Sequence, residues 1–297
     1  MFNKKNENES ILDSLFSEAS RLIIGEREHI GGVSKEVHTM NLLFCSFFNK
    51  TELTEYHNEI MNCLQALEMQ TLIIDKAIDK PSEIKDWDIR CIIGFILFPS
   101  ITESFMHAIR NLELDEKTQL KLINLWNNTF KHIYIGQGLD LIYGKKDLGL
   151  DLRNYLKIIE ETTAKFIQLS LILGAIISGK NKEEIIKIEN YGIHLGLRFQ
   201  IRDDFIDFRN DINEGKQRIF VIKEILEKLS KEEREKILDN YRKNSELCFR
   251  ILNKEEIKNY VIVVNNKELD TAISSLNGLN GVYINRLVNI ANFLRIK

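Results

Sequence analysis

Apolar residues recur every three or four positions over long segments of the chain, which is the period of an α-helix with one buried face. In residues 55–79 this face consists of Ile60, Met61, Leu64, Leu67 and Ile74. The same period predicts helices at residues 11–24, 37–48, 89–109, 116–143, 152–178 and 183–208, and two or three more toward the C-terminus, ending with residues 282–294. The pattern therefore predicts an all-α chain of about ten helices, arranged as a large bundle.

The interruptions in this pattern are short. Residues 80–88 contain Pro81 and three acidic residues, and we expect a loop there and another at the polar stretch NDINEGK, residues 210–216. The stretch YVIVV at residues 260–264 is the one candidate for a β-strand. No linker rich in Pro, Gly or Ser divides the chain, so we expect a frayed N-terminus at residues 1–10 and a single domain at residues 11–297.

The composition agrees with this prediction. Of the 297 residues, 44% are hydrophobic and 29% are charged, as in soluble globular proteins, and only two are proline, so few positions break a helix. The formal net charge is −3, so the chain lacks the excess of basic residues that is typical of nucleic-acid-binding proteins. We therefore expect no nucleic acid among the partners of the chain.

The cysteines and the N-terminus indicate the compartment. The four cysteines, Cys45, Cys63, Cys91 and Cys248, are far apart and form no Cys-x-x-Cys pair, which is typical of buried thiols in a reducing environment. The first ten residues are too polar for a signal peptide. The longest uncharged stretch, residues 166–179, is too short to cross a bilayer. These features predict a cytoplasmic protein without a transmembrane segment.

Three carboxylates lie in the otherwise apolar stretch FQIRDDFIDF, residues 199–208. On a helix, Asp203 and Asp207 share one face and Asp204 lies one position round, so their charges repel one another. One interpretation is a solvated helix end with salt bridges to Arg202 and Arg209. However, the five apolar residues around the acids leave little of the helix surface polar. A buried carboxylate needs a cation or several hydrogen-bond donors.

A second pair of acids makes a metal site the better interpretation. Asp75 and Asp79 are also four apart, at the C-terminal end of the helix predicted for residues 55–79. The two helix ends could face one another across a cavity. Carboxylates without His or Cys partners are ligands that favour Mg²⁺, and protein-bound Mg²⁺ is usually shared with substrate phosphates. The two acid pairs therefore predict a Mg²⁺ site that binds a diphosphate.

At this point the sequence resembles a known family. The segment LGLRFQIRDDFIDF is similar to the second aspartate-rich motif of the trans-polyprenyl synthetases, Phe-Gln-x-x-Asp-Asp-x-x-Asp, and follows a Tyr191-Gly192 pair as it does in that family. The family's other motifs resemble three further pairs in the expected order, Gly136-Gln137, Thr163-Ala164 and Gly215-Lys216. The resemblance extends from residue 31 to the C-terminal helix.

This resemblance implies a fold, a cofactor and a set of site residues. The fold is the all-α class I isoprenoid synthase bundle around a central cavity. In that family, three Mg²⁺ ions bind an allylic isoprenyl diphosphate in this cavity, and departure of the diphosphate group leaves an allylic carbocation. The catalytic and metal-binding acids would be Asp75, Asp79, Asp203, Asp204 and Asp207. The substrate-binding residues would be Lys216, Gln200, Thr163, Gln137 and Lys76. The family also implies a homodimer, or a heterodimer with a related synthase subunit.

The first acid motif departs from the family pattern. It should read Asp-Asp-x-x-Asp, but residues 75–79 are DKAID, so Lys76 replaces the second acid. The two arginines that normally follow correspond to Ile84 and Lys85. Lys76 could neutralise a phosphate oxygen in the place of a metal ion.

The predicted site for the acceptor, isopentenyl diphosphate, has also changed. The family's Gly-Lys-Arg-x-Arg-Pro segment corresponds to GGVSKEVHT, residues 31–39, which offers only Lys35 and His38, and the lysine of Lys-Thr-Ala is Thr162. A diphosphate carries about two to three negative charges and normally needs several Lys or Arg donors. We therefore expect a degenerate acceptor site beside a retained allylic site.

Three functions stay open on these grounds. The chain could be a Mg²⁺-dependent, polyprenyl synthetase-like transferase that ionises an allylic diphosphate and then cyclises the cation, quenches it with water or transfers it to an acceptor without a diphosphate. It could be a chain-elongating synthase with a rebuilt acceptor site. It could also be a non-catalytic partner subunit of a heteromeric synthase. The intact second motif favours an enzyme, whereas the altered first motif favours the partner.

Overall fold

A computed structural model of the chain describes residues 40–79, 87–144 and 148–293. The chain divides into two compact units, Met1–Gln119 and Leu120–Lys297. The predicted helix at residues 11–24 and most of the predicted loop at residues 80–88 lie outside the described residues. The single domain expected for residues 11–297 stays a prediction.

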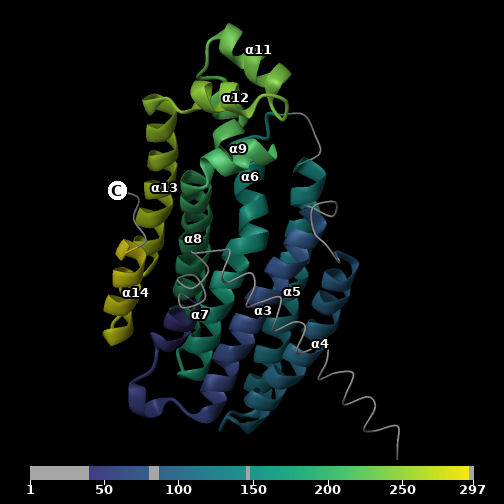
Figure 1. The fold of residues 1–297 in the computed structure, drawn as a ribbon. Coiled ribbons are helices and arrows are strands. Elements are labelled where there is room, and N and C mark those ends of the chain that lie inside the picture. Colours follow the sequence, from purple (N-terminus) through teal and green to yellow (C-terminus); the bar gives the residue numbers. More distant parts are fainter. Residues whose placement is uncertain (1–39, 80–86, 145–147, 294–297) are drawn as a thin grey trace, which may run out of the picture. The chain divides into compact units, whose positions relative to one another are not determined.

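The first unit is built on two long helices, α3 (Glu55–Asp79) and α4 (Trp87–Asn111), which lie side by side (Figure 1). A short turn, η1 (Lys50–Glu52), precedes them. The predicted bounds of α3 are confirmed, and its apolar face is buried at Ile60, Leu64, Leu67 and Ile74. A Cβ atom on Gly94 would lie 2.4 Å from Cγ1 of Ile74, so a glycine is needed where α4 meets α3.

The helices after α4 belong to the second unit, apart from the first four residues of α5 (Figure 1). In chain order they are α5 (Glu116–Gly144), α6 (Leu152–Ile159), the π-helical turn η2 (Glu160–Ala164), α7 (Lys165–Ile177), α8 (Lys182–Ile206), α9 (Phe208–Glu214), η3 (Ile219–Val221), α10 (Lys223–Leu226), α11 (Lys231–Asn240), α12 (Ser245–Leu252), α13 (Glu255–Ser275) and α14 (Val282–Phe293). Within described residues 217–293 there are five helices, α10 to α14, which is more than the two or three that the sequence predicts.

Helix α8 is the central element of this unit. It packs against α13 on one side and against α7 and η2 on another. Asn181 begins the helix, with its side chain accepting a hydrogen bond from the backbone N–H of Glu184, whose carboxylate accepts in turn from the backbone N–H of Asn181. Such a capping box satisfies backbone donors that the first turn leaves open. Helix α8 thereby has a fixed start, and its other end carries the second acid motif.

Two of the predicted elements are wrong. Residues 260–264, the strand candidate, lie within α13, because Val261 and Val264 are three positions apart and both are buried on its inner face. Residues 210–216, the predicted polar loop, are mostly helical in α9, because Phe208 and Ile212 are four positions apart and both are buried. Gly215, with φ of 67°, ends α9 in the left-handed conformation that favours glycine.

The described part of the chain contains no strand, so the predicted all-α class is confirmed. Among the same residues, no helix combines the length and the apolar character that a bilayer crossing requires.

Candidate functional site

The C-terminal end of α8 carries the three acids of the second motif and has no basic residue in its last turn. Asp203 and Asp204 lie in that turn, and Asp207 is the residue at which the helix ends. A helix C-terminus already carries partial negative charge, so three carboxylates there oppose both the helix dipole and one another. Cations or hydrogen-bond donors from elsewhere must therefore stabilise this end of α8.

Asp204 receives three such donors. Its side chain is buried, and Oδ2 accepts hydrogen bonds from the hydroxyl of Tyr155 at 2.7 Å and from the backbone N–H of Ile219 at 3.4 Å. Its Oδ1 accepts from Nε2 of Gln200 at 2.9 Å. Burial raises the pKa of the Asp204 carboxyl, while the charge of Arg218 and the three hydrogen bonds act in the opposite direction. Both oxygens of Asp204 are thus engaged by the protein itself.

Gln200 joins two of the sequence motifs. Its Oε1 accepts a hydrogen bond from the hydroxyl of Thr163 at 2.6 Å, while its Nε2 donates to Asp204. Three predicted site residues, Thr163, Gln200 and Asp204, therefore lie in one hydrogen-bonded chain between η2 and the end of α8.

Asp203 and Asp207 are more accessible than Asp204. Asp203 is half-buried and Asp207 is exposed, and the backbone N–H of Asp207 donates to the carbonyl of Asp203 at 2.8 Å. Arg209, which the surface interpretation pairs with the acids, instead forms an ion pair of 2.9 Å with Glu246. The two carboxylates offer hard oxygen ligands of the kind that Mg²⁺ prefers.

A buried arginine supplies positive charge behind these acids. Nη1 of Arg218 lies 2.8 Å from Oδ1 of Asp140, and about four-fifths of each side chain is buried, since 21% and 23% of their surfaces are exposed. Burial alone would lower the pKa of the guanidinium, but the charges of Asp140, Asp204 and Asp211 outweigh it and raise that pKa above its ordinary value. Arg218 is therefore a permanent cation paired with Asp140.

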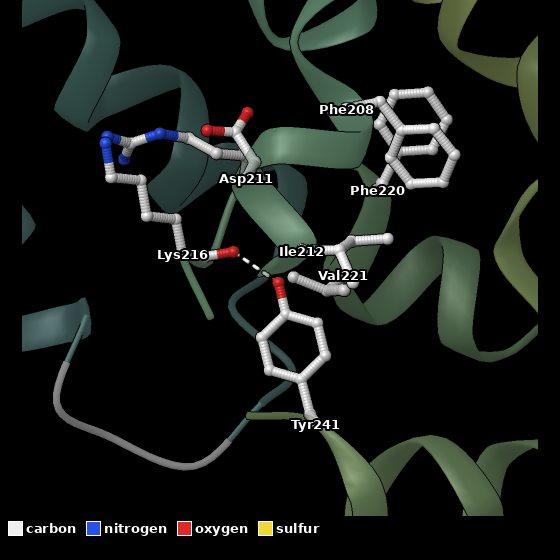
Figure 2. Close-up of a pocket in the computed structure, with 8 residues that line it drawn as sticks. Phe208, Asp211, Ile212, Lys216, Phe220, Val221 and Tyr241 are labelled. Carbon is white, nitrogen blue, oxygen red and sulfur yellow. Dashed lines mark hydrogen bonds between the residues drawn. The ribbon is translucent and has the colours of Figure 1, made fainter. Parts of the chain in front are cut away.

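The backbone around Arg218 is held on both sides. We call residues 215–219, which follow α9, the 215–219 segment. The hydroxyl of Tyr241 donates to the carbonyl of Lys216 (Figure 2), and Nε of Arg242 donates to that of Gly215 at 3.3 Å. Nε2 of Gln217 donates to the carbonyl of Tyr143, at the end of α5, at 3.0 Å. These bonds fix the segment between α5, α8 and the residues after α11.

Lys216, a predicted substrate-binding residue, lies in this segment, and its Nζ is 3.0 Å from Oε2 of Glu214. Beside it is a cavity of about 10 Å³, room for about one water molecule and too small for a diphosphate. The cavity is lined by Phe208, Asp211, Ile212, Lys216, Arg218, Phe220, Val221 and Tyr241. Figure 2 shows Asp211 and Lys216 on one side of it and the stacked rings of Phe208 and Phe220 on the other.

The glycines of the motifs allow close packing around η2. A Cβ atom on Gly136 of α5 would lie 2.7 Å from Cγ2 of Thr162, and one on Gly196 of α8 would lie 2.3 Å from Cα of Ala164. Both positions therefore need glycine, because α5 and α8 approach the π-helical turn from two sides. Single π-turns inside helices are frequent at functional sites. The half-buried Gln137 follows Gly136 on α5.

The first acid motif belongs to the other unit. Asp75, Lys76 and Asp79 lie at the C-terminal end of α3, but their side chains are outside the described part of the structure. That the two acid pairs face one another stays a prediction. Lys35, His38, Ile84 and Lys85 are also outside the described residues. Thr162, in the position of the family's lysine, donates its hydroxyl to the carbonyl of Ile158 at 3.1 Å.

Within the described ranges, no three His, Cys, Asp or Glu side chains are grouped as a ready metal site. The acids at the end of α8 nevertheless fit Mg²⁺ by their donor chemistry, because Asp203 and Asp207 supply only oxygen and the ion keeps several waters or phosphate oxygens of its own. Sequence reasoning singled out neither Arg218 nor Asp140 nor Tyr155. Asp140 is four residues after Gly136, on the same face of α5, which is the one signal that could have drawn attention to it.

Comparison with known proteins matches this chain to polyprenyl and isoprenyl diphosphate synthases. A family model described as polyprenyl synthetase matches residues 35–253. A short chain isoprenyl diphosphate synthase of Methanothermobacter thermautotrophicus is 34% identical over 156 residues, which are 49% of this chain and 46% of that protein. Component 2 of the Bacillus subtilis heptaprenyl diphosphate synthase is 28% identical over 152 residues, 49% of this chain and 41% of that protein. The chain thus matches about half the length of these relatives.

Two solved structures share the fold over nearly the whole chain. The geranylgeranyl pyrophosphate synthetase of Pyrococcus horikoshii has a TM-score of 0.75 at 17% identity, covering 98% of this chain and 96% of the other. A Caulobacter crescentus polyprenyl synthase, complexed with calcium and isoprenyl diphosphate, has a TM-score of 0.70 at 18% identity, covering 96% of this chain and 95% of the other. At these identities the likeness concerns the all-α fold.

Proposed function

Because this chain belongs to the polyprenyl synthetase family and has its all-α class I fold, we propose that it is a Mg²⁺-dependent transferase that binds and ionises an allylic isoprenyl diphosphate. The observation that carries the proposal is the end of α8, where Asp203 and Asp207 are accessible next to an ordered Thr163–Gln200–Asp204 chain. The calcium and isoprenyl diphosphate bound to the Caulobacter crescentus relative support the choice of substrate and of a divalent cation.

The proposal gives each acid of the site a task. Asp203 and Asp207, together with Asp75 and Asp79 of the first motif, would hold Mg²⁺. The bound ions would act as Lewis acids on the departing diphosphate. Asp204 holds Tyr155 and Gln200 in place behind these ligands, since both of its oxygens already accept protein hydrogen bonds. Gln200 would thereby be positioned next to the leaving diphosphate.

Cationic and polar residues would complete the binding of the diphosphate. Lys216 would leave Glu214 to contact a phosphate oxygen, and Lys76, Thr163 and Gln137 would supply further donors. In the reaction the bond between the allylic carbon and oxygen breaks, and its electron pair stays on the diphosphate. The apolar helices would exclude water from the resulting carbocation.

We further propose that the acceptor site for isopentenyl diphosphate is degenerate. The support is the sequence of residues 31–39 and of Thr162, which lack the basic donors that a second diphosphate requires. The cation would then be cyclised, captured by water as in a terpene-synthase-like cyclase or hydrolase, or transferred to an acceptor without a diphosphate. The relatives named as synthases leave chain elongation with a rebuilt site as the competing outcome.

A non-catalytic partner subunit is the second candidate function. Lys76 in the first acid motif favours it. The likeness to component 2 of a heptaprenyl diphosphate synthase supports assembly with another subunit. We propose a homodimer, or a heterodimer with a related synthase subunit, in the cytoplasm. Sedimentation of the purified chain, alone and with such a subunit, measures this assembly.

To test these functions, the purified chain is incubated with Mg²⁺ and with geranyl, farnesyl or geranylgeranyl diphosphate, each with and without isopentenyl diphosphate. Mass spectrometry then identifies the products. Diphosphate release without isopentenyl diphosphate, giving a hydrocarbon or an alcohol, is the expected result. Longer diphosphates formed only with isopentenyl diphosphate would instead identify a chain-elongating synthase. Absence of reaction in both conditions would favour the partner subunit.

A further inference from the structure

The side chain of Arg218 forms an ion pair with Asp140, and the backbone N–H of the next residue, Ile219, binds Asp204. Asp140 comes from α5, Asp204 from α8 and Asp211 from α9. Asp140 forms a direct ion pair with Arg218, and the charges of Asp204 and Asp211 also act on the guanidinium. A divalent cation in the place of the guanidinium would face the carboxylate of Asp140.

The position of this guanidinium is fixed by its backbone. Gln217 and Ile219, the neighbours of Arg218, bind the carbonyl of Tyr143 at 3.0 Å and Oδ2 of Asp204 at 3.4 Å. Arg218 itself bridges from the same segment to Asp140 at 2.8 Å. The residues on both sides of Arg218 are fixed by hydrogen bonds. Its side chain therefore loses less conformational entropy on forming an ion pair than a long side chain on an exposed surface does.

We propose that Arg218 is a built-in cation that takes the place of a metal ion at Asp140 and Asp204, so that only Asp203 and Asp207 of the second acid motif bind Mg²⁺. This inference rests on the proposed function, because it concerns which acids of that site carry metal. Arg218 is a positioning residue in this account. It holds the segment whose Ile219 N–H binds Asp204, and Asp204 in turn accepts from Gln200, without contact of Arg218 with the substrate.

The first test needs no substrate, so it is independent of whether the chain is an enzyme. Thermal unfolding of the full chain is followed in chelator-treated buffer, with and without added Mg²⁺, for the wild type and for Arg218→Met and Arg218→Lys. Removing one partner of a largely buried ion pair destabilises a fold, so Arg218→Met should lower the Tm by about 5 °C or more without metal. Mg²⁺ should restore part of that loss.

Arg218→Lys should respond to Mg²⁺ no more than the wild type does, because in both a cation already neutralises Asp140 and Asp204. The matched control is Arg209→Met, which removes an arginine from the exposed ion pair with Glu246 and should change neither the Tm nor its response to Mg²⁺. An unchanged Tm in Arg218→Met, or a loss of Tm that Mg²⁺ does not restore, would overturn the proposal.

A second test keeps Arg218 in place, in case Arg218→Met does not fold. The number of Mn²⁺ ions bound per chain in the presence of inorganic diphosphate is counted by electron paramagnetic resonance, for the wild type, Asp203→Asn and Asp204→Asn. We expect Asp203→Asn to lose bound Mn²⁺ and Asp204→Asn to keep the wild-type number. Loss of the same number in both variants would make Asp204 a metal ligand and contradict the proposal. If the wild type binds no Mn²⁺ with diphosphate, the proposed function fails as well.

Discussion

The hydroxyl of Tyr155 donates a hydrogen bond of 2.7 Å to Oδ2 of Asp204, joining α6 to the acid-bearing end of α8. Both groups are buried, and the nearby Asp204 charge adds to burial in raising the pKa of the Tyr155 hydroxyl, so the phenol stays protonated and remains a donor. The partial negative charge at the C-terminal end of α8 disfavours the ionised form of Asp204. The hydrogen bond from Tyr155 is one of three that stabilise this carboxylate.

Tyr155→Phe should therefore destabilise the fold by about 1–3 kcal/mol, the usual effect of leaving a buried acceptor with one donor fewer. Urea unfolding measures the difference in the free energy of unfolding. Tyr260→Phe, on α13, is the control and should change this free energy by less than about 0.5 kcal/mol. Equal stability of Tyr155→Phe and the wild type would mean that Ile219 and Gln200 satisfy Asp204 without the phenol.

Thr163→Val should weaken Mg²⁺-dependent binding of diphosphate by about fivefold to tenfold. Valine has the shape of threonine but cannot donate to Oε1 of Gln200, so Gln200 loses the bond that orients it, a loss of about 1 kcal/mol. Calorimetric titration with inorganic diphosphate measures the effect. The control is Thr271→Val on α13, whose hydroxyl bonds to its own helix. If the two variants bind equally well, Gln200 is not a diphosphate ligand.

Asp211 gives the stability of the fold a distinct dependence on pH. Burial and the charge of Asp204 raise the pKa of Asp211 to about 7, from an ordinary value of 3.8. Between these two values the folded chain holds a proton that the unfolded chain has released. The contribution of Asp211 to stability is therefore fully present at low pH and is lost as the pH rises to about 7.

Asp211→Asn removes this titration, so its Tm relative to the wild type should be higher at about pH 8 than at about pH 5. Calorimetry at the two pH values measures the change, with the exposed Asp239→Asn as the control. A difference in Tm that does not depend on pH would show that Asp211 is ionised in the folded chain throughout this range.

Gly196→Ala should be strongly destabilising, by about 2–4 kcal/mol, because its methyl group would lie 2.3 Å from Cα of Ala164 and would force α8 away from η2. The matched control is Gly138→Ala on α5, where a Cβ meets nothing within 4 Å and the higher helix propensity of alanine should add up to about 1 kcal/mol. Urea unfolding compares the two. Equal effects would mean that η2 and α8 can separate without cost.

Long helices were the most predictable part of the fold. The bounds of α3 follow from an uninterrupted apolar period that ends before Pro81. Helix α9 was not predicted because only Phe208 and Ile212 form its apolar face. Their burial depends on residues distant in the sequence, such as Phe220, which stacks on Phe208. The β-branched run at residues 260–264 has strand propensity, but packing of α13 against α8 decides its conformation.

The site was predictable only where residues match a motif. Asp204 was selected from the acids in an apolar stretch, and Thr163 and Gln200 were selected through the family resemblance; the structure brings the three together. Arg218 lies two positions after Lys216 with nothing in its local sequence to indicate burial. Its partner Asp140 is 78 residues away in the chain. Contacts of this kind depend on tertiary structure, so local patterns do not reveal them.

The most direct test of the central claim measures diphosphate release from farnesyl diphosphate, with and without Mg²⁺, by the wild type and by Asp203→Asn/Asp207→Asn. The matched control is the double variant Asp239→Asn/Asp270→Asn, which changes two exposed acids on α11 and α13. We predict Mg²⁺-dependent release by the wild type and the control, and a loss of about 100-fold or more in the site variant, as when stabilisation of the departing group is removed. Release that needs no Mg²⁺, or that survives in Asp203→Asn/Asp207→Asn, would contradict the account.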